Sequence, residues 1–297
     1  MGIFRGAWAV VSINFHKWKR DYRVWLIFAF TAVIIVDYLS GYTDYAVAEN
    51  RSLTGCLLPV LYLPSEISLR APKMLWHIGF ILLLCNAPFM YPVSPYAILR
   101  TRRVKWWIGE CTYIILAALI FMVFVTLVSI LVAAPAMPLA ADWGETFHDF
   151  VFGTDTHTVQ ELLERSALSI KVPQKSIMYL NPAACQIYTF FTGWGSFAVL
   201  GLLLYLVNLM QKNTVLGLGV TAVFILLDPI LTMLAPQYGY WIQVFSPVCW
   251  TSVENLHNLR SDYFVSIPFV AVAYPLLIIA LISLIAWGSK KVRIEVR

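Results

Sequence analysis

Six long runs of apolar residues divide the chain, and most charged residues lie at or beyond the ends of these runs. A hydrocarbon core of about 30 Å takes roughly 20 helical residues to cross, and the runs approach or exceed that length. The fold class that this pattern predicts is all-α and integral to the membrane. The six predicted transmembrane helices cover residues 24–40, 74–91, 106–134, 183–210, 215–235 and 264–288.

Residues 3–22 show a different pattern, with large apolar residues on one side of a helix and basic or polar residues on the other. The apolar side carries Phe4, Trp8, Val11, Phe15, Trp18 and Tyr22. This pattern is typical of an amphipathic helix that lies in the membrane interface. A helix packed against the protein's own spans would show the same pattern, and both interpretations stay open.

The composition supports a membrane protein, because 60% of the 297 residues are hydrophobic and only 12% are charged. Soluble proteins carry about twice that share of charged residues. The net charge of +5 comes from Lys and Arg residues placed mainly beside the apolar runs. That placement indicates membrane topology rather than nucleic-acid binding.

The distribution of Lys and Arg predicts which side each segment occupies. Basic residues are concentrated before the first span, between the second and third spans, and at the C-terminus. Acidic residues dominate the alternate segments. Since positive charge favours the cytoplasmic side, both termini are predicted to be cytoplasmic in a multi-pass protein of the cell membrane.

The predicted outer segments are long, and no separate soluble domain interrupts the single transmembrane domain of residues 1–297. The longest segment covers residues 135–182, where Thr158 and Glu161 form a capping box that predicts an external helix. Before the sixth span, several aromatic residues surround Pro247. Such a density of aromatic residues predicts short helices or a re-entrant segment at the outer face.

Several chemistries are missing from the sequence. No GxxxxGK[ST] loop is present, so an ATP-driven process would need a separate ATPase. Residues 193–196 lack the trailing glycine of a nucleophile elbow and lie in an apolar span, which argues against a hydrolase serine. The cysteines show no metal-binding spacing, although a disulfide between Cys185 and Cys249 is compatible with the predicted topology.

Asp228 and Glu110 are acidic residues in predicted spans, where an ionisable group is costly. Asp228 is followed by Pro229, which frees a backbone carbonyl and kinks a helix. The pair can be read as a pathway or gating site at a helix break, or Asp228 can be a structural partner of a neighbouring helix. Glu110, at the start of the third span, is a further pathway candidate and is expected to pair with a basic residue from the segment before it.

The segment between the second and third spans is short and basic. Ser94 and Pro95 suit the N-cap and first position of a helix, and positive charges follow closely. This pattern predicts a short cytoplasmic helix over residues 94–105. It can serve as a topology anchor, as a contact for a partner, or as both.

Three features together resemble the permease subunit of ABC-2 type (ATP-binding cassette, type 2) exporters. They are the six spans with an N-terminal interfacial helix, the stretch SPYAILRTRRVKWWIGE between spans two and three, and FSPVCWTSVENL before span six. The resemblance implies that the short basic helix docks on a cytoplasmic ATPase, which binds ATP and Mg²⁺. It also implies pairing with a second permease, as a homodimer or heterodimer. The coupling residues that it implies are Pro95, Tyr96, Ile98, Leu99, Arg100, Arg102, Arg103 and Lys105.

The resemblance further implies export of an amphipathic peptide, lipid or drug, with the basic residues also available to lipid phosphates. The long segment 135–182 departs from compact members of the family. One alternative is a sensor or immunity protein that binds a peptide at this segment without moving it. Another is an integral-membrane transferase that uses His148, Asp149 and Asp155. Together with His157 these residues could form a metal cluster, but their spacing matches no helical or finger pattern.

Overall fold

The computed structural model describes residues 2–64, 72–87, 103–137, 142–152, 173–211, 214–256 and 265–291. Over these residues the protein is helical and contains no strand. Five of the helices in these ranges are long and apolar enough to cross a membrane, so the chain is a multi-pass helical membrane protein. They are α2 (Tyr22–Ala48), α6 (Arg103–Ala133), α10 (Pro182–Gln211), α11 (Thr214–Tyr238) and α12 (Ile267–Lys291).

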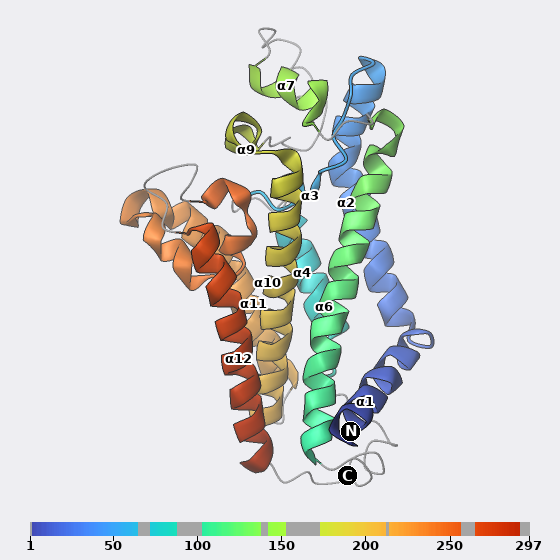
Figure 1. The fold of residues 1–297 in the computed structure, drawn as a ribbon, viewed down its shortest axis with the longest axis vertical. Coiled ribbons are helices and arrows are strands. Elements are labelled where there is room, and N and C mark those ends of the chain that lie inside the picture. Colours follow the sequence, from blue (N-terminus) through green and yellow to red (C-terminus); the bar gives the residue numbers. More distant parts are fainter. Residues whose placement is uncertain are drawn as a thin grey trace.

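Helix α10 lies at the centre of the bundle, with α6, α11 and α12 packed around it (Figure 1). Its small residues allow this central position because they let neighbouring helices approach closely. A Cβ atom added to Gly201 would lie 2.7 Å from the side chain of Ile114 and 2.8 Å from that of Leu84. A Cβ added to Gly195 would lie 2.9 Å from the ring of Tyr274. Gly201 therefore brings α10 close to α6 and to the turn that contains Leu84, and Gly195 brings it close to α12.

Helix α1 (Gly2–Trp18) packs against the first turns of α6. Ala7, Val10 and Val11 are buried in this contact, whereas Trp8 is 63% exposed. One face of α1 therefore packs on the protein's own span, and the position of its other face in the membrane interface stays a prediction. The start of α1 and the end of α12 lie at the same end of the bundle, which we call the α1 end (Figure 1).

The first span is longer than predicted. Helix α2 continues past residue 40 to Ala48, because its second half stays in contact with α6. The Thr43 hydroxyl lies 3.3 Å from the carbonyl oxygen of Val132 and also 3.3 Å from that of Leu39 in its own helix. Pairing with α6 therefore allows a helix with polar residues in its second half to extend well beyond the predicted end.

The prediction of one long helix over residues 74–91 is wrong. Helix α4 (Pro72–Leu83) has 12 residues and is followed by a turn at residues 84–87. At 1.5 Å per residue it is about 18 Å long, which is too short to cross a membrane alone. After Leu83 the backbone changes from helical to turn hydrogen bonds, with the N–H of Cys85 donating to the carbonyl oxygen of Leu82 and that of Ala87 to the carbonyl oxygen of Leu84. Among the described residues, the second crossing is therefore incomplete.

Residues 52–57, between α2 and the one-turn helix α3 (Leu58–Leu61), form an irregular and largely buried segment. Leu53 and Leu57 are fully buried. The backbone N–H of Leu58 donates to the Gln186 side chain of α10 at 3.1 Å. A buried backbone N–H group needs such a partner, because leaving it unbonded is costly.

The end of the bundle opposite α1 carries short helices, which are η1 (Ala134–Ala136), α7 (Gly144–Phe152) and α9 (Gln174–Tyr179). The Trp143 indole N–H donates to the carbonyl oxygen of Leu180 at 2.9 Å, and the Arg51 guanidinium lies 3.3 Å from the Asp149 carboxylate. We call this the α7 end. The external helix predicted near Thr158 falls outside the described residues.

Between α11 and α12 the chain forms the 3₁₀ helices η2 (Tyr240–Phe245), η3 (Cys249–Thr251) and η4 (Val253–Asn255). The prediction of short helices here is confirmed. Val248 and Cys249 are fully buried, and the Cys249 thiol lies 3.8 Å from the carbonyl oxygen of Asp228. Because Asp228 precedes the end of α11 by ten residues, this segment folds back into the bundle. We call residues 244–252 the re-entrant segment.

Candidate functional site

The most unusual side-chain contact in the bundle is a buried ion pair between α4 and α11. The Lys73 ammonium lies 2.9 Å from Oδ1 of Asp228, and the two side chains are 1% and 0% exposed. Lys73 stands in the first turn of α4, and Asp228 precedes Pro229 inside α11. The structure therefore pairs Asp228 with a neighbouring helix, and its role as a pathway or gating residue, like that of Pro229, stays a prediction.

The ion pair joins α4 to α11, but burying its two charges costs free energy. Two charges removed from water lose their hydration, and their mutual attraction offsets this only when the remaining polar atoms are also bonded. Oδ2 of Asp228 has no hydrogen-bond partner among the described residues. Removing either charge would leave the other buried and uncompensated. The packing of α4 on α11 therefore depends on the two charges being kept together or removed together.

Lys73 was missed as a site residue, because its position just before an apolar run groups it with the cations that flank predicted spans. The sequence holds one further sign, which is His77 four residues later on the same face of a helix. Two polar residues at this spacing at the start of an apolar helix indicate a polar face inside the bundle.

His77 continues the polar contacts from α4 to α10. Its Nδ1 lies 2.6 Å from the carbonyl oxygen of Lys73, and its Nε2 lies 3.1 Å from the Ser196 hydroxyl. Because a carbonyl only accepts, Nδ1 donates, and in the neutral ring Nε2 accepts from Ser196. The Phe197 ring covers the imidazole with centroids 4.6 Å apart.

A serine beside a histidine can form a nucleophile and base. Ser196, however, lies in the middle of α10, where backbone N–H groups bond to carbonyls of the preceding turn. No free backbone donors are then adjacent to stabilise an oxyanion. The contact between His77 and Ser196 is best described as a polar link between α4 and α10.

The re-entrant segment contacts both helices that flank it in sequence. The Tyr274 hydroxyl of α12 donates to the carbonyl oxygen of Pro247 at 2.6 Å. On the other side, the Cys249 thiol lies against the carbonyl oxygen of Asp228 in α11. The position of this segment therefore depends on α11 and α12 together, next to the ion pair.

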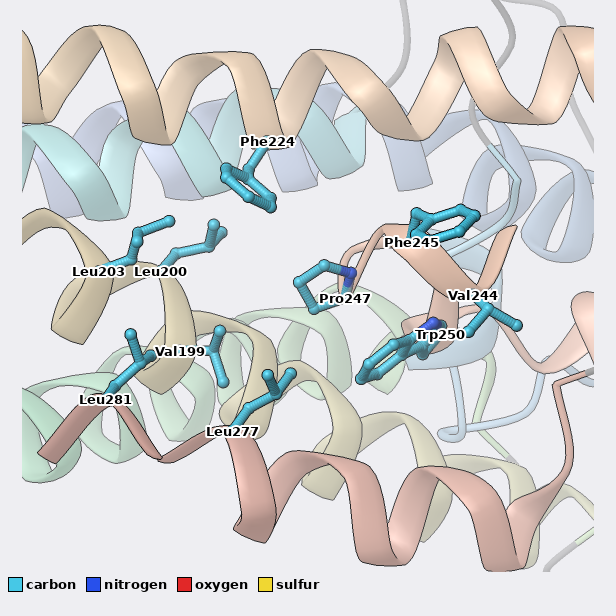
Figure 2. A pocket seen from close by; sticks show the side chains of 10 residues that line it. All are labelled: Val199, Leu200, Leu203, Phe224, Val244, Phe245, Pro247, Trp250, Leu277 and Leu281. Atoms are coloured by element: carbon cyan, nitrogen blue, oxygen red, sulfur yellow. The ribbon is translucent and has the colours of Figure 1, made fainter. Parts of the chain in front are cut away.

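A cavity of about 260 Å³ lies against the re-entrant segment, between α10, α11 and α12 (Figure 2). Helix α11 contributes Phe224, one helical turn before Asp228, and α12 contributes Leu277 and Leu281. Pro247 and Trp250 close the side toward the α7 end. We call this space the α10–α12 cavity.

A second polar contact joins α1 to α6 at the opposite end of the bundle. The Asn14 side-chain amide donates to Oε2 of Glu110 at 3.2 Å, and Glu110 is 1% exposed. The hydrogen bond described for Glu110 goes to α1, and not to the basic segment before it as predicted. Lys105 stands about 140° away around the helix from Glu110, and its side chain lies beside Gly6.

The predicted coupling residues fall mostly outside the described part of the chain. Arg103 and Lys105 lie in the first turn of α6. The others are Pro95, Tyr96, Ile98, Leu99, Arg100 and Arg102, whose arrangement stays a prediction.

Other chemical groups do not converge in the described ranges. No group of three His, Cys, Asp or Glu side chains there could hold a metal ion. Cys185 and Cys249 are free thiols. Of the residues considered for a transferase, Asp149 is paired with Arg51, and Asp155 lies outside the described residues.

No protein-family model matches the chain, and neither does any curated protein or solved structure compared with it.

Proposed function

We propose that the chain is the transmembrane permease subunit of an ATP-driven exporter of the ABC-2 type. A separate cytoplasmic ATPase would bind ATP and Mg²⁺, and a second permease would complete the transport path. The α1 end of the bundle would face the cytoplasm, in accord with the basic residues of the N-terminal segment, the segment before α6 and the C-terminus.

The observation that carries the proposal is the close packing of α1 on the first turns of α6, which we call the α1 corner. The basic segment leads directly into α6, and α1 packs along the first turns of that helix. Two hydrogen bonds fix the contact, one between Asn14 and Glu110 and one from the Trp18 indole N–H to the Tyr113 hydroxyl at 2.7 Å. A Cβ at Gly109 would lie 2.7 Å from Val10, so the two helices also approach closely.

The α1 corner is suited to transmit a movement of residues 94–105 to the rest of the bundle. A partner that moves residues 94–105 would move α6 and α1 as one unit, because their contact is buried and hydrogen-bonded. Helix α6 has 31 residues and packs on both α2 and α10. Motion at the α1 end would therefore reach the centre of the bundle, where the pair of Lys73 and Asp228 joins α4 to α11. Packed interfaces of this kind shift between discrete arrangements.

The test is copurification of the chain with a cytoplasmic ATPase, followed by substitution in the basic segment. Leu99→Asp and Arg102→Glu should each weaken assembly and remove stimulation of ATP hydrolysis. Arg20→Glu is the matched control, because Arg20 is an exposed basic residue in the turn between α1 and α2. Unchanged assembly and stimulation in both test variants would refute the coupling role of the segment.

Transport in sealed vesicles separates the exporter from the alternative of a peptide sensor. A sensor would bind a peptide at residues 135–182 without ATP-dependent movement across the membrane. Alanine substitution of His148 and Asp149 separates it from a transferase, since an exporter would keep its transport activity when these side chains are removed.

A further inference from the structure

The side chains that line the α10–α12 cavity are apolar, apart from the indole N–H of Trp250. The Trp250 indole N–H donates to the carbonyl oxygen of Gln243 at 3.1 Å. The carbonyl oxygen of Pro247 accepts from the Tyr274 hydroxyl. The other lining residues are Val199, Leu200, Leu203, Phe224, Val244, Phe245, Leu277 and Leu281. A ligand in this cavity therefore gains from contact with hydrocarbon and finds little hydrogen bonding.

We propose that the α10–α12 cavity binds the hydrocarbon chain of a single-chain amphiphile, which is the class of cargo for the transport path. This inference rests on the proposed export function, and it narrows the cargo from peptides, lipids and drugs to molecules with one long apolar chain. The polar head of such a molecule would remain outside the cavity.

The size of the cavity supports this ligand class. An apolar cavity of about 150 Å³ in a protein core stays dry and binds a benzene-sized molecule. The α10–α12 cavity, at about 260 Å³, is larger and mainly apolar. Its long walls come from three helices, so a chain lying along α10 would contact Leu200 and Leu203 on one side and Phe224 or Leu277 on the others (Figure 2).

The location of the cavity supports a ligand that arrives through the membrane. Helices α11 and α12 each pack extensively on α10, and the described residues show no comparable contact between α11 and α12. Phe245 lines the cavity and is 63% exposed. Because all three helices are long and apolar, their surroundings favour molecules that are dissolved in the bilayer over those dissolved in water.

The re-entrant segment connects the cavity to the ion pair. Pro247 and Trp250 cover the cavity, and Cys249 between them lies against the backbone of Asp228. A shift of α11 relative to α4 would therefore move this cover. Release of the ligand's hydrocarbon chain toward the α7 end would then accompany rearrangement of the contact between Lys73 and Asp228.

Photoaffinity labelling tests the proposal in membranes that contain the full chain. The first probe is a lysophospholipid with a diazirine near the end of its single chain, and the second is a two-chain phosphatidylcholine with the same group. Labelled residues are mapped by mass spectrometry. We expect the single-chain probe to label the cavity side chains of α10, α11 and α12 in preference to the exposed faces of these helices.

Leu277→Trp and Leu276→Trp form the matched pair of variants. Leu277 points into the cavity, whereas Leu276 on the same helix is 60% exposed. A tryptophan at position 277 should exclude two or more methylene groups of the probe's hydrocarbon chain from the cavity. Labelling of the cavity residues should then fall about tenfold. With a tryptophan at position 276, labelling of the cavity residues should stay within about twofold of that in the unsubstituted protein. Leu203→Trp fills the same space from α10 and provides a second test if Leu277→Trp does not fold.

Equal labelling of cavity and exposed residues, or equal labelling in both tryptophan variants, would overturn the proposal, because it would indicate contact with bulk lipid alone. Preferential labelling by the two-chain probe would also contradict it and point to a resident phospholipid. The export function is tested independently. If the protein does not associate with an ATPase, the cavity of the isolated protein can still be labelled. If the cavity is not labelled, association with the ATPase can still be observed.

Discussion

The ion pair between α4 and α11 allows a quantitative prediction for Lys73→Met. Methionine keeps an unbranched side chain of similar length, so the packing of the stem changes little. The substitution removes the ammonium 2.9 Å from Oδ1 of Asp228, and Oδ2 already lacks a partner among the described residues. An uncompensated buried carboxylate results. Breaking a buried pair in this way costs about 3–5 kcal/mol of folding free energy.

The double variant Lys73→Met/Asp228→Leu should recover most of this loss. With both charges gone, neither group is left unpaired in the apolar bundle, and such replacements are often neutral or stabilising. The free energy of unfolding can be measured by denaturant titration in mixed micelles with circular dichroism as the readout. A double-mutant cycle should then give an interaction energy of at least about 2 kcal/mol between the two positions.

Arg51→Met provides the control, because Arg51 forms a solvent-exposed pair with Asp149. Its side chain is 46% exposed, and an exposed pair contributes about 0–1 kcal/mol. The reasoning would be refuted if Lys73→Met and Arg51→Met cost the same, or if the effects of Lys73→Met and Asp228→Leu were simply additive.

The remaining predictions concern the α1 corner and a thiol. Gly109→Ala should destabilise the contact of α1 with α6 by about 1–3 kcal/mol, because the new Cβ would lie 2.7 Å from Val10; unfolding titration measures this, and an unchanged midpoint would argue against close packing. Asn14→Ala should lower the free energy of unfolding by about 1–3 kcal/mol, since the buried Glu110 loses its donor, whereas Asn14→Asp should cost more than Asn14→Ala. Burial raises the pKa of the Cys56 thiol, so at a given pH less thiolate is present than at an ordinary cysteine. Alkylation of Cys56 should therefore be slower than that of an exposed cysteine introduced by Glu49→Cys, and equal rates followed by mass spectrometry would contradict this.

The long helices were predictable from the sequence because hydrophobic length depends on local composition. Helices α6, α10, α11 and α12 begin and end within a few residues of the predicted bounds. The second span was not predictable in the same way. Its apolar run is long enough to cross, but a turn after Leu83 interrupts the helix. The irregular segment before α3 is stabilised by hydrogen bonds to distant elements, such as those from Leu53 to Ala136 of η1 and from Thr146 of α7 to Ser52. Pairing of this kind leaves no local pattern in the sequence.

Only one residue of the buried ion pair, Asp228, could be identified as a candidate from the sequence. Asp228 attracts attention because it is an acid inside an apolar run, whereas Lys73 stands at the edge of one and is easily taken for a flanking cation. Their contact joins positions 155 residues apart, so no local pattern reveals it. Glu110 was likewise identifiable as an acid at the start of a span, but its partner Asn14 lies 96 residues earlier, on a different helix.

ATP-dependent movement of a single-chain amphiphile across the membrane is the most direct test of the central claim. Inside-out vesicles that contain the chain and its copurified ATPase would be given a fluorescent lysophospholipid, and its protected fraction would be followed with and without ATP. The exporter predicts accumulation that requires ATP and is lost in Leu99→Asp while Arg20→Glu retains it. Accumulation without ATP, or equal accumulation in vesicles that lack the chain, would contradict the proposed function.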